Sequence, residues 1–283
     1  MSLTRKFGKT ALVVGASTTV GEQFARQLAA AGMDVVLVAR RLSLLESIAA
    51  ELRRDHGVQA RPVALDLTEA DALEKLEEAT NDLSIDLLVI NANLHTVGMF
   101  HAMDRATKRR MIRMNVEVPM LLVDTFGAKM VERGRGAVVF VNVLNSLAPI
   151  EIDGIFQGTK AFLRLFAESL WLEYRRHGVQ VSTVLVNGIE GSASYEQKLS
   201  PAKRTLAKVI GGSMDPKRIV AEALREIEKG RWLCVPDYTV PINQVAVTTL
   251  ETLRVLGGPG AAILSSGLSG FLLDGPGSQT GRG

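Results

Sequence analysis

Cysteine, histidine and tyrosine are scarce in this chain, and long apolar runs are absent. The single cysteine, Cys234, excludes an internal disulfide, and with only four dispersed histidines a Cys/His zinc site is not expected. No apolar run reaches the roughly 18 residues of a membrane-spanning helix, and no signal-peptide stretch stands at the start. The 33 basic and 30 acidic residues are scattered, which argues against a nucleic-acid partner. We therefore expect a cytoplasmic protein.

Short β-branched runs alternate with longer segments of helical period along most of the 283 residues. The expected strands cover 10–14, 35–39, 62–65, 86–90, 137–142, 179–186 and 232–235. The expected helices cover 20–31, a segment from 43 to Gly57, one opened by a Thr68 capping box, 105–130, 156–176 and one capped by Asp215. This order predicts an α/β fold, a Rossmann-type doubly wound parallel sheet of about seven strands with helices on both faces. We expect one domain over 1–256 and a loosely ordered Gly/Ser-rich tail over 257–283.

A glycine-containing turn joins the first strand to the first long helix. It runs from Gly15 to Gly21, where free backbone N–H groups and a helix N-terminus favour an anionic pyrophosphate. The second strand ends in Arg40 and Arg41, at the position where an acidic residue contacts a ribose 2′-hydroxyl in NAD-binding proteins. Arginine there favours the 2′-phosphate of NADP(H), although a solvated charge pair at a helix start has the same sequence.

From residue 7 to about 240 the chain resembles the short-chain dehydrogenases/reductases. The resemblance rests on the glycine turn, Asp66, the segment Asn91-Ala92-Asn93, Asn115 and Lys160. It implies a catalytic role for Asn115 and Lys160 and an NADP(H) site. The cofactor residues that we expect are Gly15, Ser17, Thr19, Val20, Gly21, Arg40, Arg41, Asp66, Leu67, Asn91, Ala92, Lys160, Gly188, Glu190 and Ser192.

Several positions depart from the family pattern on the cofactor side. Thr19 replaces the middle glycine of the turn and places a β-branched side chain where backbone normally approaches the cofactor. Asn93 replaces another glycine, and the family's Pro-Gly after the sixth strand reads Asn187-Gly188. The resemblance assigns the stretch that contains Glu190 and Ser192 to contacts with the nicotinamide carboxamide.

The largest departure is in the residues that transfer the proton. The family places a tyrosine four residues before its lysine and a serine thirteen residues before that tyrosine; here these positions hold Phe156 and Val143. Neither a benzene ring nor an isopropyl group has a proton to give, and no tyrosine of the chain stands four residues before a lysine. Ketone reduction by the usual family mechanism is therefore expected to be severely impaired.

Three polar residues near the expected cleft are candidates to replace the lost pair. His95 follows the fourth strand and titrates in the useful range, although a plain loop histidine has the same sequence. Asn145 and Asp153 flank the vacated positions, and Asp153 is also suited to completing a turn before the helix. Lys160 is equally explained by cofactor binding alone.

Two functional hypotheses follow from these residues. The first is an atypical enzyme of this family that binds an apolar small molecule and NADP(H). Its chemistry would be redox with a substitute acid, or non-redox isomerisation, dehydration or cyclisation. The second is a non-catalytic relative that binds a ligand or nucleotide or stabilises a partner. The resemblance also implies a homodimer or homotetramer built on the helices at 105–130 and 156–176.

Overall fold

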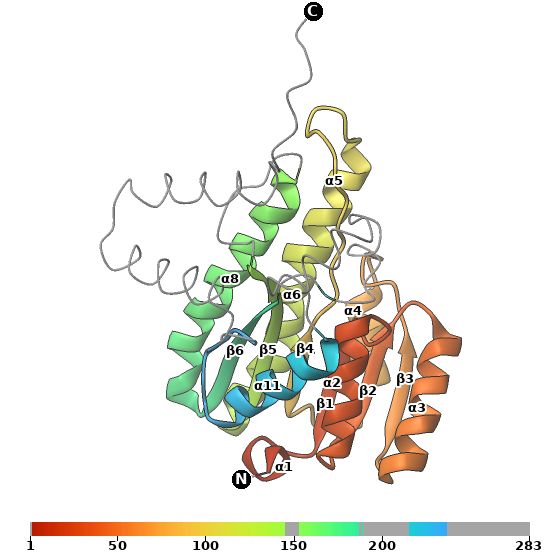
Figure 1. Cartoon of the computed structure of the whole chain (residues 1–283), viewed down its shortest axis with the longest axis vertical. Coiled ribbons are helices and arrows are strands. Elements are labelled where there is room, and N and C mark those ends of the chain that lie inside the picture. The colour runs from red at the N-terminus through yellow and green to blue at the C-terminus, as the bar shows by residue number, and fades with distance from the viewer. Residues whose placement is uncertain (1, 145–152, 187–188, 190–214, 237–283) are drawn as a thin grey trace, which may run out of the picture.

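The computed structural model describes residues 2–144, 153–186, 189 and 215–236. Within them, seven parallel strands form one sheet in the order β3-β2-β1-β4-β5-β6-β7 (Figure 1). The strands are β1 (Thr10–Val14), β2 (Asp34–Ala39), β3 (Ala60–Ala64), β4 (Leu87–Ile90), β5 (Gly136–Val143), β6 (Val179–Val186) and β7 (Leu233–Cys234). The predicted Rossmann-type doubly wound sheet is thus confirmed, whereas the predicted tail at 257–283 lies outside the described residues.

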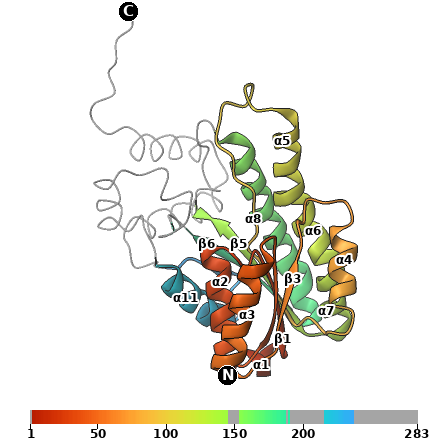
Figure 2. The same ribbon diagram turned by 90° about the vertical axis from the view of Figure 1, so that its right-hand side faces the viewer.

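Helices cover both faces of this sheet, as Figure 2 shows from the side. One face carries α2 (Thr19–Ala30), α3 (Leu42–His56) and α11 (Pro216–Glu228). The other carries α4 (Ala72–Ala79), α5 (Arg105–Ile112), α6 (Val118–Leu122), α7 (Ala128–Arg133) and α8 (Gly154–Tyr174). The central strands are apolar on both sides because each side is buried. The strand order reverses between β1 and β4, which is where open α/β sheets bind ligands.

Two of the predicted helix boundaries are confirmed in atomic detail, and one is wrong. Gly57 ends α3 in the left-handed conformation at φ 66°, and the Asp215 side chain accepts a hydrogen bond from the Lys217 N–H at 2.9 Å. Thr68 does not cap a helix, since α4 begins only at Ala72. Its hydroxyl donates to the Asp66 carboxylate at 2.7 Å and so closes a turn after β3.

The expected strand at 10–14 is preceded by a helix that was not predicted. A short helix, α1 (Leu3–Lys6), comes first, and the Ser2 hydroxyl accepts a hydrogen bond from Arg5 N–H at its start. Leu3 and Phe7 stand one turn apart and are both buried in the core. This four-residue spacing of apolar side chains was the available signal for the helix.

The expected long helix is continuous from Arg105 to Arg133 but contains two π-helical segments. These are η1 (Arg113–Glu117) and η2 (Val123–Gly127), and η1 contains Asn115. The hydrophobic period indicates a helix but not where a turn widens, so neither segment was predicted. No helix in the described ranges is long and apolar enough to cross a bilayer.

Candidate functional site

The turn between β1 and α2 is built on two glycines that side chains cannot replace. Gly15 has φ +83°, and a Cβ there would lie 2.7 Å from the backbone nitrogen of Ala92 after β4. A Cβ at Gly21 would lie 2.1 Å from the Gly15 carbonyl oxygen. The turn therefore holds β1, α2 and the end of β4 in close contact at the switch point of the sheet.

Side-chain hydrogen bonds fix the shape of this turn. The Thr18 hydroxyl donates to the Gly15 carbonyl at 2.9 Å and accepts from the Gly21 N–H at 3.3 Å, which caps α2. The Asn91 amide donates to the same hydroxyl at 2.7 Å and to the Gly15 carbonyl at 3.2 Å. Thr19 is the first residue of α2, so its β-branched side chain stands on helical backbone rather than in the turn. The α2 N-terminus is thereby presented as an anion site.

Basic side chains gather beside this turn, at the carboxyl ends of β2 and β3. Arg40 is exposed, and the Arg41 guanidinium donates to the Ser17 carbonyl at 3.0 Å. Burial pushes the pKa of Asp66 up, but the Thr68 hydrogen bonds and the charges of Arg40 and Arg110 outweigh burial and lower it. Arg110, on α5, was missed because nothing in the sequence links it to a strand end so far away. These arginines make the edge suited to a phosphate.

Lys160 and Phe156 stand one turn apart on α8 and are both buried. Burial lowers the pKa of Lys160 from 10.5 to about 8, and its side chain has no hydrogen bond or ion pair with any described residue. The Lys160 Nζ lies 5.5 Å from the centre of the Phe156 ring. The Asn142 amide ties this helix to β5 by donating to the Lys160 carbonyl at 2.9 Å, next to Val143. A buried cation thus faces an apolar ring.

The structure brings His95 and Asp153, predicted separately, into direct contact. The His95 Nε2 lies 2.9 Å from Asp153 Oδ1, and the imidazole stacks on the Phe156 ring with centres 4.0 Å apart and an interplanar angle of 26°. The other Asp153 oxygen accepts from the Gln157 amide at 3.0 Å. Asp153 is the N-cap residue of α8, but its side chain makes no cap hydrogen bond to the helix, and its predicted role as a substitute acid stays a prediction. Gln157 was missed by sequence reasoning.

Asn115 holds the residue that precedes His95. Its side-chain oxygen accepts from the Leu94 N–H at 2.8 Å, and its amide donates to the Leu94 carbonyl at 2.9 Å and the Thr159 hydroxyl at 3.2 Å. The side chain is fully buried, inside the π-helical segment η1. Its observed role is therefore to position the loop after β4, and its predicted catalytic role stays a prediction.

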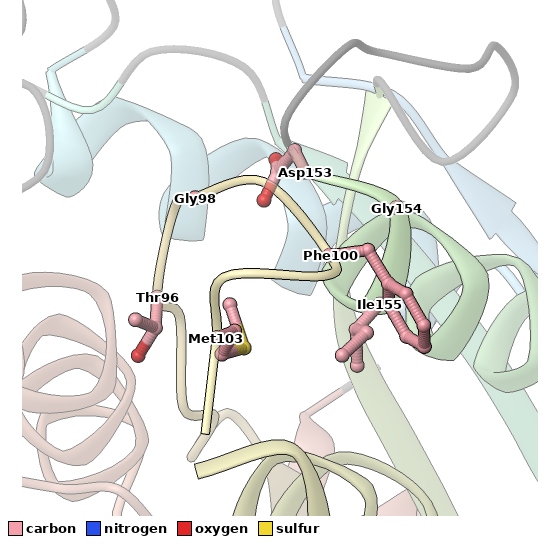
Figure 3. A pocket seen from close by; sticks show the side chains of 7 residues that line it. All are labelled: Thr96, Gly98, Phe100, Met103, Asp153, Gly154 and Ile155. Atoms are coloured by element: carbon pink, nitrogen blue, oxygen red, sulfur yellow. The ribbon is translucent and has the colours of Figure 1, made fainter. Parts of the chain in front are cut away.

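A small hollow adjoins Asp153 of the His95–Asp153 pair. It is shallow, and a water-sized group has about 10 Å³ of space in it. Figure 3 shows the loop after β4 facing the start of α8 across this hollow. Its lining residues are Thr96, Gly98, Phe100, Met103, Asp153, Gly154 and Ile155. Because most of these are apolar or glycine, the hollow suits an apolar group placed beside the Asp153 carboxylate.

The remaining predicted residues lie outside the described part of the chain. Asn145, Gly188, Glu190 and Ser192 fall among the residues that are not described. Tyr174 ends α8 about 27 Å from Phe156 at 1.5 Å per residue, so it supplies no hydroxyl to the site. Within the described residues no group of three His, Cys, Asp or Glu side chains is arranged to hold a metal ion.

Fold and site together define a dinucleotide-binding α/β protein with a lysine and an asparagine beside the switch point. Residues 9–201 match the family model described as short chain dehydrogenase. The chain therefore belongs to the short-chain dehydrogenase family.

Individual proteins and solved structures are similar to this chain over most of its length. A 7beta-hydroxysteroid dehydrogenase of Clostridium sardiniense is 28% identical over 229 residues, which cover 81% of this chain and 86% of the relative. A solved structure that concerns 7beta-hydroxysteroid dehydrogenase stereoselectivity superposes with a TM-score of 0.81, at 24% identity, over 94% of this chain and 100% of its own. A short-chain dehydrogenase from Sphingobium yanoikuyae in complex with NADPH superposes with a TM-score of 0.74, at 25% identity, over 96% and 98% of the two chains.

Proposed function

We propose that this protein is an NADP(H)-dependent oxidoreductase that acts on an apolar ketone or alcohol without the usual serine and tyrosine. One observation carries the proposal. Phe156, four residues before the buried Lys160, bears no hydroxyl, and the His95 imidazole, which contacts Asp153, is stacked on its ring. Family membership and relatives named as hydroxysteroid dehydrogenases support redox chemistry on an apolar substrate.

The residues of the switch point fit a dinucleotide phosphate. Gly15 and Gly21 let the turn pack closely against the backbone of Ala92 and of Gly15 itself, and the α2 N-terminus lies at the same turn. Arg40 and Arg41 would take the 2′-phosphate, and the NADPH complex of the Sphingobium yanoikuyae relative supports that preference. The other residues proposed to line this site are Ser17, Thr19, Val20, Asp66, Leu67, Asn91, Ala92 and Lys160. When bound, the cofactor supplies the hydride that reduces a carbonyl carbon.

The buried Lys160 is proposed to hold the nicotinamide ribose. Its ammonium has no hydrogen-bond acceptor among the described residues, and an unpaired buried cation is costly unless a ligand completes its bonds. A ribose hydroxyl pair is a suitable acceptor. This role explains the lysine even where no tyrosine stands beside it.

A titration with NADPH and NADH tests the cofactor proposal. Arg40→Ala is expected to weaken NADPH binding by about 10-fold or more, because a charge-assisted bond to phosphate is lost, and to leave NADH binding unchanged. Fluorescence of the reduced cofactor measures both, and Arg109→Ala, an exposed arginine on α5, is the matched control. If neither dinucleotide binds at millimolar concentration, redox chemistry is excluded and the non-catalytic alternative stands.

A homodimer or homotetramer is proposed from apolar side chains exposed on neighbouring helices. Ile112 on α5, Met120 on α6 and Phe162, Leu165 and Leu172 on α8 are all exposed, Leu165 by 56%. The helices α5 and α8 pack side by side (Figures 1 and 2). Large apolar side chains on one surface are typical of an association face.

Light scattering on a charged variant tests this association. Leu165→Arg is expected to shift the protein to the mass of a monomer, because it buries an unpaired charge in the interface. Glu74→Arg on α4, which is exposed and distant from α8, should keep the mass of the wild type. An unchanged mass for the Leu165 variant would place the interface elsewhere.

A further inference from the structure

We propose that His95 and Asp153 form an acid–base dyad that transfers the proton to and from the substrate oxygen in place of a tyrosine. This inference rests on the proposed function, and it names the group that performs the step left open by Phe156 and Val143. It is carried by two contacts of one imidazole ring, both made by the start of α8, and by the hydrogen bonds that hold the preceding residue, Leu94.

The imidazole is held on several sides. Its Nε2 contacts Asp153 at 2.9 Å, and its face stacks on Phe156 at 4.0 Å between ring centres. Both backbone polar groups of Leu94, the preceding residue, are bound by the Asn115 side chain. A histidine on an unrestrained loop would have none of these contacts. The geometry therefore indicates a ring with a fixed position, which proton transfer requires.

Asp153 is suited to orient this ring. Its carboxylate is buried, 7% exposed, and holds the Gln157 amide with its second oxygen. An ionised carboxylate accepts hydrogen bonds only, so it keeps a proton on the His95 Nε2 and leaves Nδ1 for another partner. Among the described residues, Nδ1 has no hydrogen-bond partner. Asp153 is thus a positioning residue, and the atom that exchanges the proton is His95 Nδ1.

The proton step balances with these two residues alone. In the direction of reduction, the ring begins as an imidazolium; its Nδ1–H bond breaks as an O–H bond forms on the substrate oxygen. The ring ends neutral, with its remaining proton on Nε2, and Asp153 stays ionised throughout. The described charged group in contact with this ring is Asp153, and the Lys160 Nζ lies 5.5 Å from the centre of the Phe156 ring on which the imidazole stacks.

The hollow beside the dyad indicates which part of the substrate lies there. Asp153 lines it together with Met103 and Ile155, so the dyad borders an apolar surface. A substrate whose apolar skeleton contacts these side chains lies beside Asp153, the residue of the dyad that lines the hollow. We therefore expect bulky apolar ketones, a 7-oxosteroid among them, to be preferred over short polar ones.

The protonation state of His95 tests the dyad without turnover. Long-range ¹H–¹⁵N NMR of the full chain, recorded at a pH where the ring is neutral, is expected to show the single proton of His95 on Nε2. In Asp153→Asn, whose amide can donate to Nε2, the proton should move to Nδ1. An unchanged tautomer in the variant would contradict the orienting role of Asp153, because the carboxylate would then not control the ring.

Kinetics test the transfer itself. His95→Gln keeps a donor toward Asp153 but cannot protonate substrate, and kcat/KM for a panel of apolar ketones that includes a 7-oxosteroid is expected to fall about 10²–10⁴-fold. The NADPH dissociation constant should stay within twofold. His101→Gln, an exposed histidine of the same loop, is the matched control and should retain wild-type kcat/KM.

The outcomes separate the two proposals. Equal kcat/KM for wild type and His95→Gln overturns the dyad while leaving the oxidoreductase intact. If the His95 variant fails to fold, as judged by circular dichroism, Asp153→Asn supplies the test: a shift of the pH profile of kcat/KM to lower pH supports the dyad, because the carboxylate no longer stabilises the imidazolium, and an unchanged profile contradicts it. A wild type that binds NADPH and reduces no ketone of the panel contradicts the proposed function instead.

Discussion

A triple variant carrying His95→Gln, Val143→Ser and Phe156→Tyr is expected to reduce ketones about 10²-fold faster than His95→Gln alone. The phenol introduced at position 156 would stand on α8 one turn before Lys160. The Lys160 ammonium lowers the pKa of a neighbouring phenol. The serine at the end of β5 adds a donor to the same substrate oxygen. The expected gain is the lower part of the range for a positioned general acid, because a new hydroxyl is less well oriented than an evolved one.

A matched variant without hydroxyl groups controls for repacking. His95→Gln with Val143→Ala and Phe156→Leu alters the same three positions and offers no proton, so its kcat/KM should stay at the level of His95→Gln alone. Failure of the hydroxyl-bearing variant to exceed this control, with NADPH still bound, would mean that the substrate oxygen does not lie beside position 156. The account of an acid lost there would then be wrong.

Lys160→Met is expected to stabilise the free protein and to weaken its binding of NADPH. Burial lowers the pKa of Lys160 from 10.5 to about 8, and no described residue pairs with its ammonium. This difference in pKa corresponds to a free energy of about 3 kcal/mol that opposes folding below pH 8. That value is an upper bound for the stability gained by Lys160→Met. Loss of a charge-assisted bond to the ribose should raise the NADPH dissociation constant about 10–100-fold.

The pH dependence identifies the cause of this stability change. Below about pH 8 both folded and unfolded chains hold the Lys160 proton, and the full penalty is present. Between about 8 and 10.5 the unfolded chain binds more protons than the folded one, so wild-type stability rises with pH relative to the methionine variant. Urea unfolding at pH 7, 9 and 10.5 measures the closing difference. Lys129→Met, an exposed lysine over the Phe126 ring, should show no such trend.

A difference between wild type and Lys160→Met that does not change with pH would contradict this account. It would mean that the lysine is paired in the folded protein and carries no desolvation penalty. Unchanged NADPH affinity would separately remove the ribose contact, while leaving the stability argument in place.

The sheet was predictable because its strands are short β-branched runs whose hydrophobic pattern does not depend on distant contacts. Strands at 10–14 and 179–186 have the predicted bounds, and Asp215 and Gly57 mark helix ends by local chemistry. The hydrogen-bond partner of Thr68 was not predictable in this way. Its hydroxyl had two competing partners, a helix N–H and the Asp66 carboxylate, and sequence order does not rank them.

The candidate site was predictable as a set of residues but not as an arrangement. His95 and Asp153 are 58 residues apart, and only the packing of the loop after β4 onto the start of α8 brings their side chains together. Gln157 and Arg110 had no sequence signal, since their roles depend on which face of a helix meets which strand end. The absence of a hydroxyl at positions 143 and 156, by contrast, is readable from the sequence alone.

The most direct test is a single-turnover measurement of bound NADPH with a saturating apolar ketone. The account predicts that wild type oxidises the cofactor in one exponential phase and that His95→Gln does so at least about 10²-fold more slowly, with the same amplitude. Equal single-turnover rates for the two proteins would contradict it, because the proton would then reach the substrate oxygen without the imidazole.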